Sequence, residues 1–216
     1  MEQMKQLALY VETGRSEQAL KQVRALLDAG YDVETIVRDG LMAGLNEVGR
    51  KFASQEYFLP EMLSAARAMK RTEQMLTAVC GPIRPRWRQK VVLGTVKNDL
   101  HDIGKNLVRM AIENLGIEVI DLGMDVCAEQ FVQAAEEDED VAFVGISALL
   151  TTTMPAMRDT VRALRRCRAA NRIRILVGGA PITAAFAKKI GADLYTETAF
   201  EAAEAIRRML EGGKAE

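Results

Sequence analysis

Apolar residues recur every three or four positions along the first 80 residues of the chain, which is the spacing of helices that bury one face. In the stretch "SEQALKQVRALLDAG", Ser16 is expected to cap the start of a helix and Gly30 to end it. Because the connections between such stretches are short, the pattern predicts an antiparallel helical bundle. Four helices are expected, over residues 2–12, 16–30, 33–52 and 59–81.

The pattern changes at Lys90, where short apolar runs rich in valine and isoleucine begin. The runs are "VVLGTV", "IEVIDLG", "VAFVGIS", "IRILVGGA" and "ADLYT", and a helical stretch follows each of them. Repeated strand–helix units predict a five-stranded parallel sheet with helices on both faces, of the flavodoxin-like, doubly wound class. The helices are expected over residues 103–115, 127–137, 153–170, 181–190 and 198–212.

The segment "CGPIRPRWRQK" (residues 80–90) separates the two patterns, and its two prolines and its basic residues predict a linker. It is interpreted as a solvated hinge, with a docking patch for a partner as the alternative. The sequence therefore predicts an all-α helical bundle over residues 1–88 and an α/β domain over residues 89–216.

Composition and charge exclude several classes of partner. The net charge of −1 gives no electrostatic reason to expect nucleic acid, and no run of about 18 apolar residues predicts a membrane span. The N-terminal segment is too charged for a secretory signal. Three widely spaced cysteines predict reduced thiols, and without a CxxC pair or a second histidine a zinc site is not expected. We expect a cytoplasmic protein.

The one histidine, His101, lies in "GTVKNDLHDIGKNLV", where the first strand is expected to lead into a helix. Residues two apart in an extended loop face the same side, so Asp99 can accept a hydrogen bond from one ring nitrogen of His101. The other nitrogen is then available to a metal. Asp102 could be the partner instead, or could cap the helix, and Gly104 leaves room for a bulky group. A plain surface histidine is the alternative interpretation.

Two further strand ends are expected at the same edge of the sheet as His101. Ser147 ends the third strand, and Gly178 with Gly179 ends the fourth. Taken singly, these residues are compatible with ordinary strand ends and turns, and the threonines at 151–153 with a helix cap. Taken together, they predict a slot that admits a ligand between the strand ends.

These residues form a pattern that resembles the cobalamin-binding fingerprint of methionine synthase and of corrinoid proteins. The pattern is Asp99-x-His101-x-x-Gly104, then Ser147-x-Leu149, then Gly178-Gly179, with 42 and 28 residues between its parts. The segment "GLMAGLNEVGRKFASQEYFLPEMLSAARAM" is similar to the helical cap of methyl-transferring cobalamin proteins. The resemblance covers nearly the whole chain and is strongest to free-standing corrinoid proteins of anaerobic methyltransferase systems.

The resemblance implies a role for each matching residue. His101 would replace the cofactor's own benzimidazole as the lower cobalt ligand, Asp99 would hydrogen-bond His101, and Thr153 would complete that relay. Phe52 and Leu59 would shield the methyl face, although Phe52 also suits the core of the bundle. The remaining cofactor-binding residues would be Asp102, Gly104, Ser147, Leu149, Thr151, Gly178, Gly179 and Ala199.

The same resemblance implies a function in one-carbon metabolism. The chain would carry a methyl group on cobalamin, between cob(I)alamin and methylcobalamin, from a substrate-specific methyltransferase to a second one that acts on tetrahydrofolate or a thiol. A reductive activase is a further implied partner. The chain would be a carrier rather than a catalyst, with the helical domain as a lid. The alternatives are the small subunit of an adenosylcobalamin mutase, a cobalamin-dependent sensor or regulator, and a flavodoxin-like domain that binds flavin or no ligand.

Overall fold

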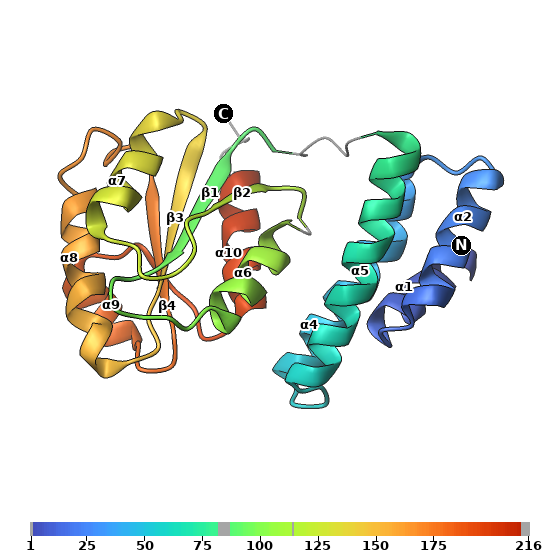
Figure 1. Ribbon diagram of the computed structural model, residues 1–216, viewed down its shortest axis with the longest axis horizontal. Helices are drawn as coiled ribbons and strands as arrows, with labels where there is room; N and C mark the ends of the chain where they lie inside the picture. Colours follow the sequence, from blue (N-terminus) through green and yellow to red (C-terminus); the bar gives the residue numbers. More distant parts are fainter. Residues whose placement is uncertain (1, 82–86, 114, 213–216) are drawn as a thin grey trace. The chain divides into compact units, whose positions relative to one another are not determined.

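The computed structural model of the chain describes residues 2–81, 87–113 and 115–212, without the side chains of Ala53 and Leu59. The chain divides into two compact units, Met1–Arg84 and Pro85–Glu216, and each is described here by itself (Figure 1). The sequence placed this boundary four residues later, between residues 88 and 89. Within the described residues, no helix combines the length and the apolar character that crossing a membrane requires.

The N-terminal unit consists of helices that run where the apolar periodicity places them. They are α1 (Glu2–Glu12), α2 (Ser16–Asp28), a third helix built from α3 (Val33–Thr35), the π-helical segment η1 (Ile36–Met42) and α4 (Ala43–Ala53), and α5 (Leu59–Cys80). Their buried face is lined by large apolar side chains. These include Leu7, Leu26, Ile36, Leu41, Leu45, Met62 and Leu76.

Two glycines in the third helix allow α1 to approach it closely. A Cβ added at Gly40 would lie 2.5 Å from the Leu7 side chain, and one at Gly44 would lie 2.4 Å from the Ala8 carbonyl oxygen. The first of these contacts falls within the π-helical segment η1. A π-helical segment shifts the face of the helix that follows it, and this segment leaves both glycines against α1.

The predicted cap of α2 is wrong in detail. Ser16 is the first residue of the helix, and Arg15 takes the cap position without a side-chain hydrogen bond. The chain turns at Gly14, whose backbone has a φ of +67°, and the Ser16 amide donates to the Gly14 carbonyl at 2.9 Å. This backbone turn occupies the place that a serine cap would take.

The C-terminal unit is a parallel sheet with the strand order β2-β1-β3-β4-β5. The strands are β1 (Lys90–Thr95), β2 (Glu118–Asp121), β3 (Val141–Ser147), β4 (Arg174–Gly178) and β5 (Leu194–Tyr195). The helices are α6 (Ile103–Glu113), α7 (Ala128–Glu137), α8 (Met154–Leu164), α9 (Ala184–Ile190) and α10 (Ala199–Gly212), with a short 3₁₀ turn η2 (Thr151–Thr153) before α8. This architecture confirms the predicted flavodoxin-like sheet preceded by a helical bundle. The strand order reverses between β1 and β3, which is where such folds bind ligands.

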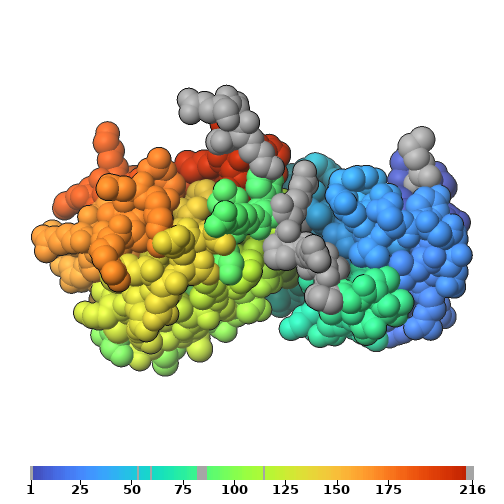
Figure 2. Space-filling view, turned by 90° about the horizontal axis from the view of Figure 1, so that it is seen from above, coloured from blue at the N-terminus to red at the C-terminus, as the bar shows by residue number. Residues whose placement is uncertain are grey.

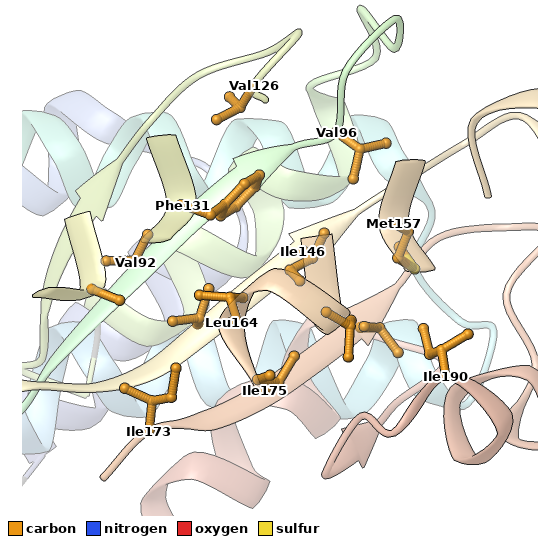
Figure 3. Close-up of a cluster of buried hydrophobic side chains, with 14 of the residues drawn as sticks. Val92, Val96, Val126, Phe131, Ile146, Met157, Leu164, Ile173, Ile175 and Ile190 are labelled. Carbon is orange, nitrogen blue, oxygen red and sulfur yellow. The ribbon is translucent and has the colours of Figure 1, made fainter. Parts of the chain in front are cut away.

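Alternate residues of each strand enter two separate cores, one on each face of the sheet. Helices α7, α8 and α9 cover one face, and α6 and α10 cover the other (Figure 1). Figure 2 shows α7 (yellow) and α8 (orange) next to each other on the surface of this unit. Figure 3 shows the core beneath them, with Val92, Ile146 and Ile175 from the strands and Phe131, Met157 and Leu164 from the helices. Burial on both faces explains why the strands read as unbroken apolar runs.

The predicted solvated linker is wrong for its last part. Trp87 is only 6% exposed and packs into the core under α6 and α10. Its indole nitrogen donates to the Leu115 carbonyl at 3.2 Å, and Arg88 pairs with Asp140 at 2.7 Å. The one aromatic residue of the segment therefore belongs to the C-terminal core, because its buried area outweighs the polar character of its neighbours. The two prolines fall in residues 82–86, which lie outside the described residues.

Candidate functional site

Three strand ends meet at one edge of the sheet. Thr95 at the end of β1 pairs with Ser147 at the end of β3, and Ser147 pairs with Gly178 at the end of β4. The loop from Val96 to Asp102 leaves β1 at this edge and carries His101. The structure thus brings the three predicted parts of the site together at the point where the strand order reverses.

His101 and Asp99 form a direct hydrogen bond. The distance between Nδ1 of the imidazole and Oδ1 of the carboxylate is 2.8 Å. The backbone amide of His101 donates to the same oxygen at 3.1 Å. An ionised carboxylate only accepts, so Nδ1 carries the proton, and in the neutral imidazole Nε2 keeps its lone pair. The His101 side chain is 49% exposed, whereas the Asp99 side chain is fully buried.

The second oxygen of Asp99 is held by residues from the β3 end. The Leu149 amide donates to it at 2.8 Å, and the Thr153 hydroxyl donates to it at 2.8 Å. Burial raises the pKa of Asp99, but these hydrogen bonds and those from His101 outweigh burial and lower the pKa to about 2. The Asp99 carboxylate is therefore ionised at neutral pH, and the Thr153 hydroxyl serves Asp99 rather than capping α8.

Asp102 and Gly104 flank the start of α6. The Asp102 carboxylate accepts a hydrogen bond from the side-chain amide of Asn106 at 2.9 Å, and Asp99 rather than Asp102 is the hydrogen-bond partner of His101. A Cβ built on Gly104 meets no heavy atom within 4 Å. Space therefore remains beside the first turn of α6, at a position three residues after His101 in the chain.

The glycine pair after β4 lies against the end of β3. Gly179 has a φ of +129°, and a Cβ at this position would lie 1.8 Å from the Ala148 carbonyl oxygen. No other residue fits there. The Ala148 amide donates to the Gly178 carbonyl at 3.2 Å, so the two strand ends stay joined. The glycines leave backbone, not side chains, between the tips of β3 and β4.

Large apolar side chains are exposed at the same edge, on the loops and at the first residue of α6. A cluster of this kind on one edge of a domain marks a binding surface rather than a random exposure. The sequence analysis had singled out only Leu149 among them, because a single apolar residue in a loop carries no periodic signal. The set consists of Leu100, Ile103, Met124, Leu149 and Leu150.

The structure also shows a buried charge pair that the sequence analysis missed. Lys105 in the first turn of α6 is buried, and its ammonium contacts both carboxylate oxygens of Asp121 at 2.6 and 2.7 Å. Burial raises the pKa of Asp121, but the Lys105 ammonium, the Gly123 amide and the charge of Arg109 together outweigh burial and lower it. This pair ties the start of α6 to the end of β2. An ordinary-looking lysine in a helical pattern offers no signal for such a role.

The remaining predicted residues are less closely tied to His101. Thr151 is exposed at the start of η2, and Ala199 is half-buried at the start of α10. Phe52 is half-buried in α4 of the N-terminal unit. The Leu59 side chain lies outside the described residues.

Comparisons with known proteins match both units. A family model described as "B12 binding domain" matches residues 89–204, and a second model with the same description matches residues 3–76. Dimethylamine corrinoid protein 3 of Methanosarcina acetivorans is 41% identical over 177 residues, which is 82% of this chain and 83% of that protein.

Solved structures give the same picture. A chain of the methanol:cobalamin methyltransferase complex MtaBC from Methanosarcina barkeri is 29% identical, with a TM-score of 0.82 over 98% of this chain and 80% of that one. A cobalamin-binding protein from Desulfitobacterium hafniense is also 29% identical, with a TM-score of 0.75 over 95% and 97% of the two chains.

Proposed function

The chain belongs to the B12-binding corrinoid proteins of methyltransferase systems, and we propose that it passes a methyl group from a substrate-specific methyltransferase to a second methyltransferase. The observation that carries the proposal is the contact between His101 Nδ1 and the buried Asp99 carboxylate at 2.8 Å. It leaves Nε2 of a half-exposed imidazole as a nitrogen ligand. Nitrogen ligation by an oriented histidine is what a corrinoid carrier requires of its protein.

The described residues fit a corrinoid. His101 offers one nitrogen for cobalt, and the apolar side chains on the surrounding loops suit a flat macrocycle. The backbone at Gly178 and Gly179 and the open position beside Gly104 suit an elongated nucleotide tail. We propose that Asp102, Ser147, Leu149, Thr151 and Ala199 contact the cofactor around this framework.

When bound, cobalamin supplies a cobalt centre that accepts a methyl group as cob(I)alamin and releases it from methylcobalamin. The protein's part is to hold and release a nitrogen ligand. Asp99 keeps the proton on Nδ1, and the Leu149 amide and Thr153 hydroxyl keep Asp99 in place. These contacts fix the ring of His101 so that Nε2 is the nitrogen offered to the metal.

We propose that the helical unit shields the reactive face, with Phe52 and Leu59 as the shielding residues. The support is the resemblance of this segment to helical cap modules and the match of residues 3–76 to a B12-binding model. A neighbouring residue adds to it. Phe58 is 63% exposed, and its amide is held by the Glu61 carboxylate at 2.9 Å, so a large aromatic side chain is presented on a fixed backbone.

The names of the relatives narrow the proposed partners. Because the curated relatives include corrinoid proteins named for dimethylamine and for trimethylamine, we propose a methylamine methyltransferase as the donor partner. A second methyltransferase with a tetrahydrofolate or thiol acceptor and a reductive activase complete the proposed system. The cysteines at positions 80, 127 and 167 are free thiols, which fits the reducing cytoplasm that we propose as the location.

The function is tested by the absorption spectrum of the protein after loading with hydroxocobalamin and desalting. The wild type is expected to retain corrinoid with a nitrogen-ligated spectrum. His101→Ala is expected to lose ligation by imidazole and so to differ in spectrum from the wild type, because the chain has no second histidine. Free imidazole added to the variant should restore the nitrogen-ligated spectrum if the slot is intact. A wild type that retains neither hydroxo-, methyl- nor adenosylcobalamin would contradict the proposal.

A further inference from the structure

The loop that carries His101 is bonded along its length to the loop that follows β2. The Thr95 amide donates to the Gly123 carbonyl at 2.9 Å, and the Val126 amide donates back to the Thr95 carbonyl at 2.9 Å. The Asp125 amide donates to the Asp99 carbonyl at 3.1 Å. The backbone of Asp99 is therefore held from the β2 side, while its carboxylate is held from the β3 side.

The side chain of Asp125 makes two more contacts with the same loop. Its Oδ1 accepts a hydrogen bond from the Asn98 amide at 2.8 Å, and its Oδ2 accepts one from the Lys97 ammonium at 3.0 Å. Asp125 thus contacts three consecutive residues, Lys97, Asn98 and Asp99. The Asn98 amide and then the Lys97 ammonium lower the pKa of Asp125, so its carboxylate is ionised and accepts at both oxygens.

The backbone at both ends of this contact is in the left-handed region. Asn98 has a φ of +64° and Asp125 a φ of +55°. Non-glycine residues adopt this conformation at a cost, and asparagine and aspartate tolerate it best. The amide of Asn98 points at the Asp125 carboxylate because of this conformation, so the hydrogen bond offsets the cost of the turn that leads into Asp99.

We propose that Asp125 is a positioning residue for His101. Its carboxylate fixes the turn Lys97–Asp99, and the fixed turn holds the Asp99 carboxylate where it meets Nδ1 of the imidazole. Asp125 acts through Asp99 and needs no contact with the cofactor. The inference rests on the proposed function only where it treats His101 as the cobalt ligand, and its first test uses protein without corrinoid.

The test exploits the single histidine of the chain. In protein labelled with ¹⁵N, the imidazole signals report directly whether the proton sits on Nδ1 or Nε2. Two substitutions of Asp125 separate the effect of its carboxylate from the effect of its backbone conformation, because glycine and asparagine both tolerate a left-handed φ. Asp125→Gly removes the acceptor for the Asn98 amide, and Asp125→Asn keeps an oxygen there. Lys97→Met removes the ion pair alone.

Asp125→Gly is expected to shift the ratio of the two tautomers away from the Nδ1–H form by roughly tenfold. Asp125→Asn and Lys97→Met are expected to stay within about twofold of the wild type, because the exposed ion pair contributes little. The matched control is Asp159→Asn on α8. It removes another exposed carboxylate that is paired with arginines, and it should leave the ratio unchanged.

A second readout uses the protein loaded with hydroxocobalamin. Asp125→Gly should reduce the fraction that shows the nitrogen-ligated spectrum, while corrinoid retention persists. If the wild type binds no corrinoid, the proposed function fails, but the tautomer result still decides the role of Asp125. Wild-type tautomer ratios in Asp125→Gly, together with a lower melting temperature, would mean that Asp125 only stabilises the fold, and would overturn the inference. A loss in Asp125→Asn as large as in Asp125→Gly would also overturn it.

Should Asp125→Gly fail to fold, the wild type provides the decisive measurement. Hydrogen exchange of the Asn98 amide should be slowed to the level of the Thr95 and Val126 amides, which are donors within the same pair of loops. Exchange at the rate of an unprotected amide would show that the carboxylate does not hold the turn, and would overturn the inference.

Discussion

Two loops carry or adjoin the residues proposed to face the cofactor, and a buried carboxylate holds each loop. In the C-terminal unit, Asp99 holds the loop that bears His101. In the N-terminal unit, Glu12 holds the loop between α4 and α5, because its carboxylate accepts from the Lys51 ammonium at 2.6 Å and from the Tyr57 hydroxyl at 3.0 Å. The Glu12 side chain is 11% exposed and the Asp99 side chain is fully buried.

The difference lies in the charges of the partners. The negative charge of Glu12 is neutralised by the ammonium of Lys51, so this contact fixes the local structure and leaves no unpaired charge. Apart from His101, the hydrogen bonds that the structure describes to Asp99 come from backbone amides and the Thr153 hydroxyl, all of them uncharged. The charge of Asp99 therefore remains available to the imidazole. A carboxylate held by neutral donors keeps its charge for orienting a histidine, whereas one paired with lysine only fixes structure.

The largest effect is expected from Asp99→Asn. The amide cannot accept from every donor that surrounds Asp99, so at least one buried group loses its partner. Unfolding free energy should fall by about 3 kcal/mol, and His101 ligation should weaken roughly 10- to 100-fold. Trp87 is the one tryptophan of the chain and lies in the C-terminal core, so its fluorescence during urea unfolding reports the stability of this unit. The corrinoid spectrum reports the ligation.

Glu12→Gln is the matched control for Asp99→Asn. It should destabilise the helical unit by about 2 kcal/mol, because the buried Lys51–Glu12 pair is broken. Circular dichroism detects this change, while the Trp87 fluorescence transition and the His101 spectrum should keep their wild-type behaviour. A change of the His101 spectrum in Glu12→Gln would show that Glu12 also affects His101, and it would contradict the distinction drawn here between Glu12 and Asp99.

The sequence predicts contacts between residues that are close together in the chain, but it does not predict contacts between residues that are far apart in the chain. The Asp99–His101 bond follows from two residues on the same side of an extended loop, and the strand ends follow from the order of the strand–helix units. The Leu149 amide, 50 residues from Asp99, becomes its donor only through the pairing of β1 with β3. Such long-range donors leave no local pattern, so the very low pKa of Asp99 could not be foreseen.

The misread elements have similar causes. The π-helical segment contains Gly40, which lies against Leu7, and periodicity alone does not distinguish such a segment from an ordinary helix. Trp87 was assigned to a linker because its neighbours are basic and proline-rich, although one buried indole decides its place. The helix expected over residues 153–170 ends at Leu164, and Ala169 instead enters the core from a turn.

Acid provides the next largest effect, which is expected at Asp99. A carboxylate with a lowered pKa in the folded protein stabilises it above the pKa of the unfolded chain, and this contribution disappears as pH falls through the folded value. For Asp99, whose pKa falls from 3.8 to about 2, the contribution is about 2 kcal/mol above pH ~5. The stability difference between wild type and Asp99→Asn, measured by Trp87 fluorescence, should therefore be constant down to pH ~5 and shrink below pH ~4. A constant difference to pH ~2 would contradict the lowered pKa.

The smallest effect is expected at Thr153, and it tests whether the donors of Asp99 matter one by one. Thr153→Val keeps the shape of the side chain and removes the hydroxyl that donates to Asp99 at 2.8 Å. The Leu149 amide still holds the same oxygen, so the loss should be about 1 kcal/mol in stability, and His101 ligation should weaken roughly fivefold. Thr153→Ser retains the hydroxyl and should keep the wild-type ligation even where the lost methyl group lowers stability. If the Val and Ser variants weaken ligation equally, the packing of the side chain rather than its hydroxyl causes the effect. The Thr153 hydroxyl would then have no part in orienting His101 through Asp99.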